Sequence, residues 1–307
     1  MPTPVAAPAP PTAAQSTWVA AVVGGTPDLS LFVRPNAARA DAYWAPLIAR
    51  ALSGSDRPGD FISHGSGMLV LNAEQIDLYI SDRDPLRSVR DKGSKSDPRS
   101  IAWVGVIHGM APVDPVALRN GSGVPLFAPG SRLASGVMMY PPDEAYAREY
   151  APFAPTLFIT SDGTRIVTEE GSAPRARDLF ASNGTPPSAL NAAPEALAGV
   201  TFGVTSMRFL SAQKGDQTAM LQGAVAVGFG LRGGTEGAID AYADYATPDD
   251  AARAYQAFEG SCAQKPNPCS FEPAMFRDAR AVRDGQRIAM RLSFSEKLLR
   301  SLRDWTP

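Results

Sequence analysis

The chain is poor in the residues that carry most enzyme chemistry. Its 307 residues include only two histidines, His64 and His108, and only two cysteines. The serine at position 66 lacks the glycine that a nucleophile elbow needs two positions earlier, because His64 stands there. The sequence therefore identifies no catalytic motif, no cofactor site and no metal site.

The chain also lacks an excess of charge of either sign. Its 29 lysines and arginines face 31 aspartates and glutamates, which gives a formal net charge of −2. Proteins that bind nucleic acid concentrate positive charge on one surface, and this balance predicts no such surface. Nucleic acid is therefore not expected as a partner.

Long hydrophobic runs are missing as well. The longest apolar stretches, 18–23 and 224–229, have the length of a strand. A membrane-spanning helix needs about 20 apolar residues, so the sequence predicts no transmembrane segment.

Residues 2–15 are mainly proline and alanine and carry no charge. Such a composition cannot bury enough surface to fold, so residues 1–17 are expected to form a disordered tether. The stretch has neither the basic start nor the apolar centre of a signal peptide. It is typical of the spacer that follows a removed export or lipoprotein signal, and the alternative is the disordered start of a cytosolic protein.

The two cysteines, Cys262 and Cys269, enclose a polar loop with prolines at 266 and 268. Proline disfavours a helix and favours a turn, which would bring the two sulfurs within disulfide reach. Two free buried thiols are the alternative. Neither histidine lies near this pair in sequence, so a zinc site is not expected. A disulfide would indicate an oxidising, extracytoplasmic compartment, the periplasm or cell envelope.

Strand and helix patterns alternate along residues 18–182, which are expected to form an N-terminal lobe. Asp114 and Pro115 predict the start of a short helix, and Ser161-Asp162-Gly163 predicts a hairpin turn. The expected strands are 29–34, 68–71, 76–80, 101–107, 136–140, 156–160 and 164–169, and the expected helices are 36–52 and 174–181.

Residues 183–195 are rich in proline, asparagine and alanine and predict a linker to a C-terminal lobe, 196–307. In this second lobe Thr247 and Pro248 predict a helix start, and Ser295 caps a final helix. The expected strands are 200–210, 220–232, 235–245 and 288–294, with a helix from Thr247 to about Glu259. The fold class is therefore α+β, with mainly antiparallel sheets faced by helices in two lobes.

The segment Gly228–Gly233 matches GxGxxG and follows a strand pattern. A dinucleotide site needs a helix directly after this motif. Residues 238–245 instead alternate apolar and polar side chains, which indicates a strand. The motif is therefore interpreted as a glycine-rich hairpin with a bulge.

His108 follows the buried strand pattern 101–107, and Asp114 lies six positions later as a candidate orienting carboxylate. His64 lies between serines and glycines. These three residues, His108, Asp114 and His64, are weak catalytic candidates for a hydrolase. The other interpretation of His108 is a hydrogen-bonded structural histidine.

Two pairs of segments and one single junction carry a family resemblance. They are Leu31–Pro35 with Tyr43–Leu52, Thr156–Thr160 with Arg175–Phe180, and the junction Ala243–Ala251. Together they resemble exported lipoproteins and cell-envelope proteins of myxobacteria. The resemblance implies export and a lipid anchor upstream of this chain, although the lipobox cysteine of such proteins is absent here. It implies no activity and supplies no functional residues.

The sequence as a whole favours an exported cell-envelope binding or interaction protein without catalytic activity. Its partner would be an unidentified protein or an apolar small-molecule ligand. The alternatives are a hydrolase that uses His108 with a carboxylate, and a carrier of apolar, lipid-like ligands. An exposed apolar patch would favour the interaction role, a polar pocket at a histidine the hydrolase, and an apolar cavity between sheet and helices the carrier.

Overall fold

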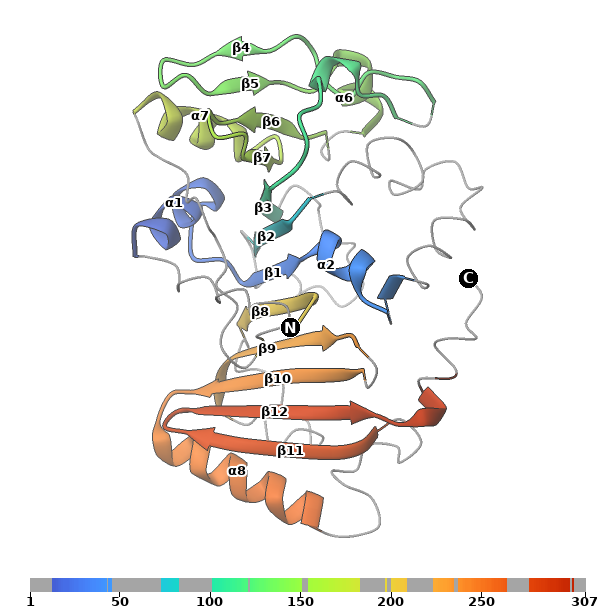
Figure 1. Cartoon of the computed structure of the whole chain (residues 1–307). Coiled ribbons are helices and arrows are strands. Elements are labelled where there is room, and N and C mark those ends of the chain that lie inside the picture. The colour runs from blue at the N-terminus through green and yellow to red at the C-terminus, as the bar shows by residue number, and fades with distance from the viewer. Residues whose placement is uncertain are drawn as a thin grey trace. The chain divides into compact units, whose positions relative to one another are not determined.

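The computed structural model describes residues 13–42, 44–45, 73–82, 101–120, 122–150, 154–182, 197, 200–208, 223–234, 237–263, 276–298 and 300. These residues form antiparallel sheet with a few helices, which confirms the predicted predominance of antiparallel sheet (Figure 1). They divide into two compact units. Unit 1 contains the described residues within 13–36 and 73–182, and unit 2 those within 37–45 and 197–300.

The sheet of unit 1 pairs its strands antiparallel throughout. Directly opposite residues of neighbouring strands therefore share one face. Gly163, with a φ of 83°, completes the turn of the predicted β6–β7 hairpin. The spatial order is β1 (Leu29–Val33), β2 (Gln75–Asp82), β3 (Ile101–His108), β7 (Arg165–Thr168), β6 (Thr156–Ile159), β5 (Met138–Tyr140) and β4 (Ser131–Arg132).

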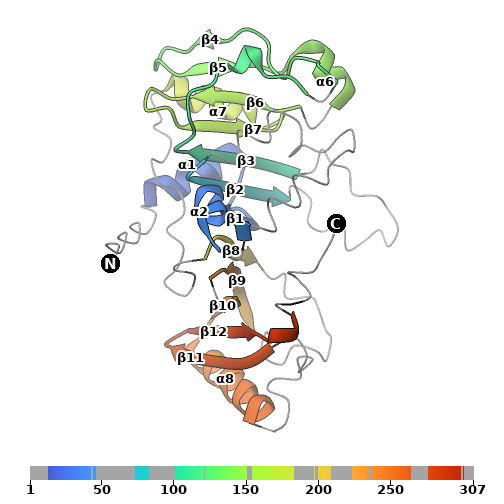
Figure 2. The same cartoon turned by 45° about the vertical axis from the view of Figure 1, so that its right-hand side comes forward.

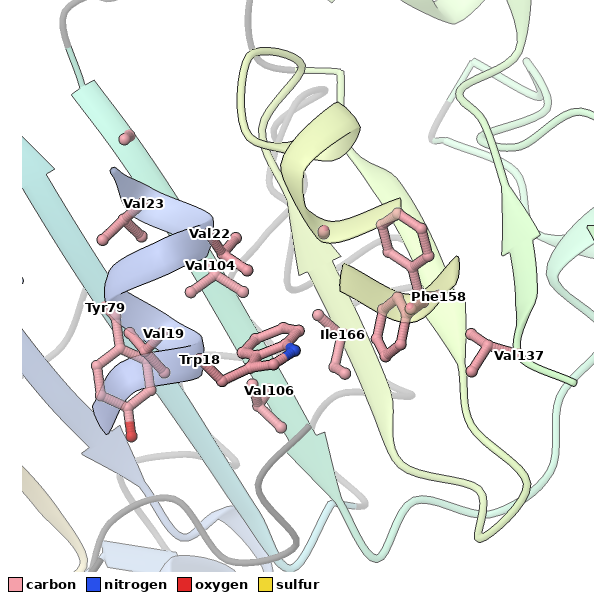
Figure 3. Packing of buried hydrophobic residues seen from close by; sticks show 13 residues of the cluster. Trp18, Val19, Val22, Val23, Tyr79, Val104, Val106, Val137, Phe158 and Ile166 are labelled. Carbon is pink, nitrogen blue, oxygen red and sulfur yellow. The ribbon is translucent and has the colours of Figure 1, made fainter. Parts of the chain in front are cut away.

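Helices α1 (Ala13–Val23) and α7 (Ala173–Ala181) pack on one face of this sheet. Trp18 of α1 contacts Phe180 of α7, with ring centroids 5.7 Å apart. Figure 3 shows Trp18 beside Val106 of β3 and Ile166 of β7. On the other face, at the β6–β7 end, Leu157 packs with Leu126, Phe127 and Tyr146, the last from α6 (Glu144–Tyr150).

The sheet of unit 2 is also antiparallel and carries helix α8 (Pro248–Ala263) on one face (Figure 2). The Thr247 hydroxyl accepts a hydrogen bond from the Asp250 amide at 3.1 Å, so Thr247 is the N-cap that the sequence predicts. The spatial order is β11 (Phe276–Asp284), β12 (Arg287–Phe294), β10 (Ala238–Tyr245), β9 (Ala224–Arg232) and β8 (Phe202–Arg208).

The prediction of a disordered tether over residues 1–17 is wrong for its last residues, because α1 begins at Ala13. The apolar stretch 18–23, which has the length of a strand, also belongs to this helix. The segment contains alanines, which favour a helix. Its buried side chains recur at helical spacing, at Trp18, Val19, Val22 and Val23. Burial of this stripe against the sheet and α7 stabilises the helix despite its three valines.

Several predicted segments differ from the structure or lie outside it. Helix α2 spans only Pro35–Ala40, strand β11 was not predicted, and α8 continues to Ala263 rather than to Glu259. The division between the units falls between residues 192 and 193, inside the predicted linker 183–195. The linker and strand 68–71 lie outside the described residues and remain predictions. Residues 37–45 belong to unit 2 rather than to the expected N-terminal lobe.

Candidate functional site

Strand β2 turns its polar residues toward the helices of unit 1. Asp77 is fully buried, and Tyr79 and Ser81 are buried beside it. Tyr79 belongs to the same core cluster as Trp18 of α1, which places this row of side chains on the helix face of the sheet. An antiparallel sheet with one packed face normally buries its apolar side and exposes its polar side, and β2 does the reverse.

The opposite face of β1 and β2 is aliphatic and half-buried. The strand register places three aliphatic pairs directly opposite one another, Leu29 with Ile80, Leu31 with Leu78, and Val33 with Ile76. We call these six residues the aliphatic face. The aliphatic face continues onto β3, because Leu78 is directly opposite Gly105 and lies beside the position that a side chain at Gly105 would occupy. Directly opposite aliphatic pairs form a flat apolar surface suited to contact with another apolar body.

A polar cluster lies at one end of the helix face. Gln75 is directly opposite His108, and its amide donates hydrogen bonds to both carboxylate oxygens of Asp77, at 2.9 and 3.1 Å. The Nε2 atom of His108 lies 3.7 Å from Oδ2 of Asp77. The charge of Asp77 also acts on the half-buried Arg34, at the end of β1. We call Arg34, Gln75, Asp77 and His108 the polar cluster.

Burial dominates the electrostatics of the polar cluster. Desolvation lowers the pKa of His108, and the nearby carboxylates of Asp162 and Glu74 oppose this effect only in part. Desolvation likewise lowers the pKa of Arg34, against the opposing charge of Asp77. Burial and the charge of Asp77 both raise the pKa of Tyr79. His108 is therefore a neutral imidazole at pH 7.

The expected pairing of His108 with Asp114 is wrong. An oxygen of the Asp114 carboxylate accepts a hydrogen bond from the Val116 amide at 3.1 Å and caps the short helix Pro115–Ala117. The carboxylate beside His108 belongs to Asp77 instead. His64 lies outside the described residues.

The cysteine pair is not placed by the structure. The backbone of Cys262 belongs to α8, whereas Cys269 lies outside the described residues. The disulfide stays a prediction.

Asp77 could not be identified as a site residue from the sequence, because its strand pattern is ambiguous. Residues 75–82 alternate polar and apolar side chains, which predicts a strand with two distinct faces. The alternation does not say which face the helices cover. Asp77 lies in the middle of a strand, and the neighbouring strand ends in a histidine. This combination is the signal that would have identified it.

The glycine-rich motif of unit 2 is confirmed as part of a hairpin. Strands β9 and β10 pair antiparallel, and a register irregularity lies at Asp244 and Tyr245. Gly228 lies under the Tyr242 ring, where any side chain would collide with that ring. The motif's glycines therefore serve close packing within the sheet.

Two further properties concern only the part of the chain that the structure describes. No three side chains of histidine, cysteine, aspartate or glutamate there are grouped so that they could hold a metal ion. None of the helices in that part has the length and apolar character needed to cross a membrane.

No protein-family model matches the sequence, and no curated protein matches it. A solved structure, crystal form IV of TP0453, is similar over 92% of this chain and 94% of its own, with 11% sequence identity and a TM-score of 0.44.

Proposed function

We propose that this protein is an exported cell-envelope binding protein, without catalytic activity, that contacts an apolar partner through its aliphatic face. One observation supports this proposal above the others. Strand β2 buries Asp77, Tyr79 and Ser81 and leaves Ile76 and Leu78 half-buried on the opposite face. Burial of a carboxylate costs free energy. We infer that β2 keeps its polar side buried because its opposite, aliphatic side contacts a partner.

The extracytoplasmic location is part of the same proposal. It is supported by the uncharged Pro/Ala segment at 2–15 and by the spacing of Cys262 and Cys269. We further propose that the two compact units act as two lobes, each with helices on one face of its sheet. A peptide map under non-reducing conditions tests the location, because two free thiols at these positions would contradict it.

Native mass spectrometry of the protein purified from an envelope extract tests the binding function. The wild type is expected to carry a co-purifying ligand or partner, and Leu31→Gln combined with Leu78→Gln is expected to lose it. Val282→Gln is the matched control, because Val282 is 66% exposed on β11 and belongs to unit 2, so it is not a residue of the aliphatic face. Circular dichroism checks that all three proteins fold. Clean apo masses for wild type and control would contradict the proposal.

A hydrolase is the second candidate, and one observation favours it. A histidine lies near a buried carboxylate, with His108 Nε2 3.7 Å from Asp77 Oδ2; this separation exceeds a hydrogen bond, so substrate binding would have to shorten it before the two could act as a general base and its orienting group. The test measures hydrolysis of short- and medium-chain p-nitrophenyl esters by the wild type and by His108→Asn. Turnover that is lost in the variant would replace the binding proposal with this one.

A further inference from the structure

Two buried polar atoms lie unpaired in the layer between the sheet of unit 1 and its helices. The Nε1 atom of Trp18 and the Oγ1 atom of Thr168 have no hydrogen-bond partner among the described residues. Trp18 is 5% exposed and Thr168 fully buried. Thr168 is directly opposite Val104, which belongs to the same core cluster as Trp18. Buried polar groups are almost always paired with protein, ordered water or a ligand, so each of these two atoms has room for a partner that a polar ligand group could supply.

Helix α1 covers part of this layer through apolar packing. It has 11 residues, none of them charged, and an isolated helix of that length is marginal in water. Its docking rests on the apolar stripe of Trp18, Val19, Val22 and Val23 and on a hydrogen bond from Arg175 of α7. The Nε atom of Arg175 donates to the Val22 carbonyl at 2.6 Å.

We propose that α1 lifts to admit an amphiphile with an alkyl chain and a carbonyl or carboxyl head, similar to a fatty acid. The chain would lie on Val104, Val106 and Ile166, which the helix now covers (Figure 3). The head would accept a hydrogen bond from the Thr168 hydroxyl on the sheet and, once α1 closes over the ligand, a second one from the Trp18 indole N–H. This site lies on the face of the sheet opposite the aliphatic face, so it goes beyond the proposed function and stands independently of it.

Fluorescence titration of the full chain with 11-(dansylamino)undecanoic acid, below its micellar concentration, tests the site. Thr168→Val is the main variant, because it keeps the shape of the side chain and removes the unpaired hydroxyl. We expect this variant to bind the probe about fivefold more weakly, the effect of one lost hydrogen bond, and to melt at a higher temperature than the wild type without probe. The two opposite changes together distinguish a ligand contact from a structural hydroxyl.

Arg175→Gln tests the role of α1 as a cover, and Arg177→Gln is its control on the same helix. Arg177 is exposed and contacts Asp178 only at the surface, at 3.2 Å. Loss of the Arg175 hydrogen bond is expected to favour the released state, so Arg175→Gln binds the probe more tightly and Arg177→Gln binds it as the wild type does.

Several outcomes would overturn the proposal. They are no probe binding by the wild type and Arg175→Gln, equal binding by Thr168→Val and wild type, or a Thr168→Val protein that melts at a lower temperature. The double variant Leu31→Gln, Leu78→Gln separates the two sites. Probe binding lost there and kept in Thr168→Val assigns the probe to the aliphatic face and rejects a site under α1.

Discussion

Each of the two units has a buried aspartate within a strand, Asp77 in β2 of unit 1 and Asp240 in β10 of unit 2, and the two aspartates have different partners. In unit 2, Asp240 accepts hydrogen bonds from Arg291 at 2.6 Å and from Arg232 at 2.8 Å, both on neighbouring strands. In unit 1, the partners of Asp77 include the neutral Gln75 amide, and His108 lies 3.7 Å away.

The partners of Asp240 indicate a structural role, whereas those of Asp77 indicate surroundings that respond to pH. Arginine stays protonated at all ordinary pH values, so the two cationic partners of Asp240 keep their charge. Histidine changes its charge near neutral pH, so the surroundings of Asp77 do change. In unit 2 the buried Asp240 thus holds neighbouring strands together. In unit 1 the titratable His108 lies beside the buried Asp77, on the face of the sheet that the helices cover.

The largest expected effect is that of Asp240→Ala. The substitution leaves two arginines without their shared carboxylate, and we expect a loss of about 2–3 kcal/mol in the free energy of unfolding. The arginine side chains are 30% and 53% exposed and retain contact with water, which keeps the loss below that of a fully buried pair. Urea denaturation measures it, with Asp278→Ala, at an exposed ion pair, as a nearly neutral control. Equal losses in the two variants would contradict the structural role of Asp240.

Asp77→Asn is expected to cost less, about 1–2 kcal/mol, because the amide keeps the shape and part of the hydrogen bonding of the carboxylate. The same urea measurement applies, with Asp240→Asn as the matched variant in unit 2. If Asp77→Asn destabilises the protein more than Asp240→Ala does, the contrast between the two carboxylates is lost.

Thr247→Ala compares the helices of the two units. Helix α8 has an N-cap and two aspartates in its first turn, whereas the first turn of α1 has no acidic residue. Removal of the cap is expected to cost about 1 kcal/mol. Thermal unfolding measures the loss. Thr247→Ser, which keeps the hydroxyl, should restore most of it.

The smallest expected effect is the pH response of His108. Because burial lowers its pKa in the folded protein, the unfolded chain binds more protons when the pH falls through the ordinary histidine value of 6.5. The wild type should therefore lose stability between pH 7 and pH 5, and His108→Asn should lose less. Chemical denaturation at a series of pH values gives the two profiles. Parallel profiles would exclude His108 as the responsive group.

The sequence predicts the regular parts of the fold well where local signals agree. The Thr-Pro-Asp-Asp start of α8, the turn at Gly163 and the buried strand β3 all match the structure, because capping, turn and apolar-run signals are local. Strand β11 escapes prediction because arginine and aspartate make up five of its nine residues, as suits the end strand of the unit 2 sheet.

The candidate sites were less predictable, because they depend on which face of a strand is covered. The alternation in β2 is visible in the sequence, but the packing of α1 on its polar side is a tertiary fact. Helix α1 itself looks like a strand, since Val19, Val22 and Val23 are β-branched. His108 was a candidate from its position at a strand end, and its carboxylate neighbour was misassigned to Asp114.

The link between α1 and α7 also sets an order of assembly. Val22 and Arg175 are 153 positions apart, so α1 leaves the ribosome long before the helix that holds it. Contacts so distant in sequence form slowly, and we expect α1 to dock last, onto a sheet that is already paired. During that interval Val104, Val106 and Ile166 face solvent. A chain that crosses a membrane before folding would present this surface in the compartment where it finally works.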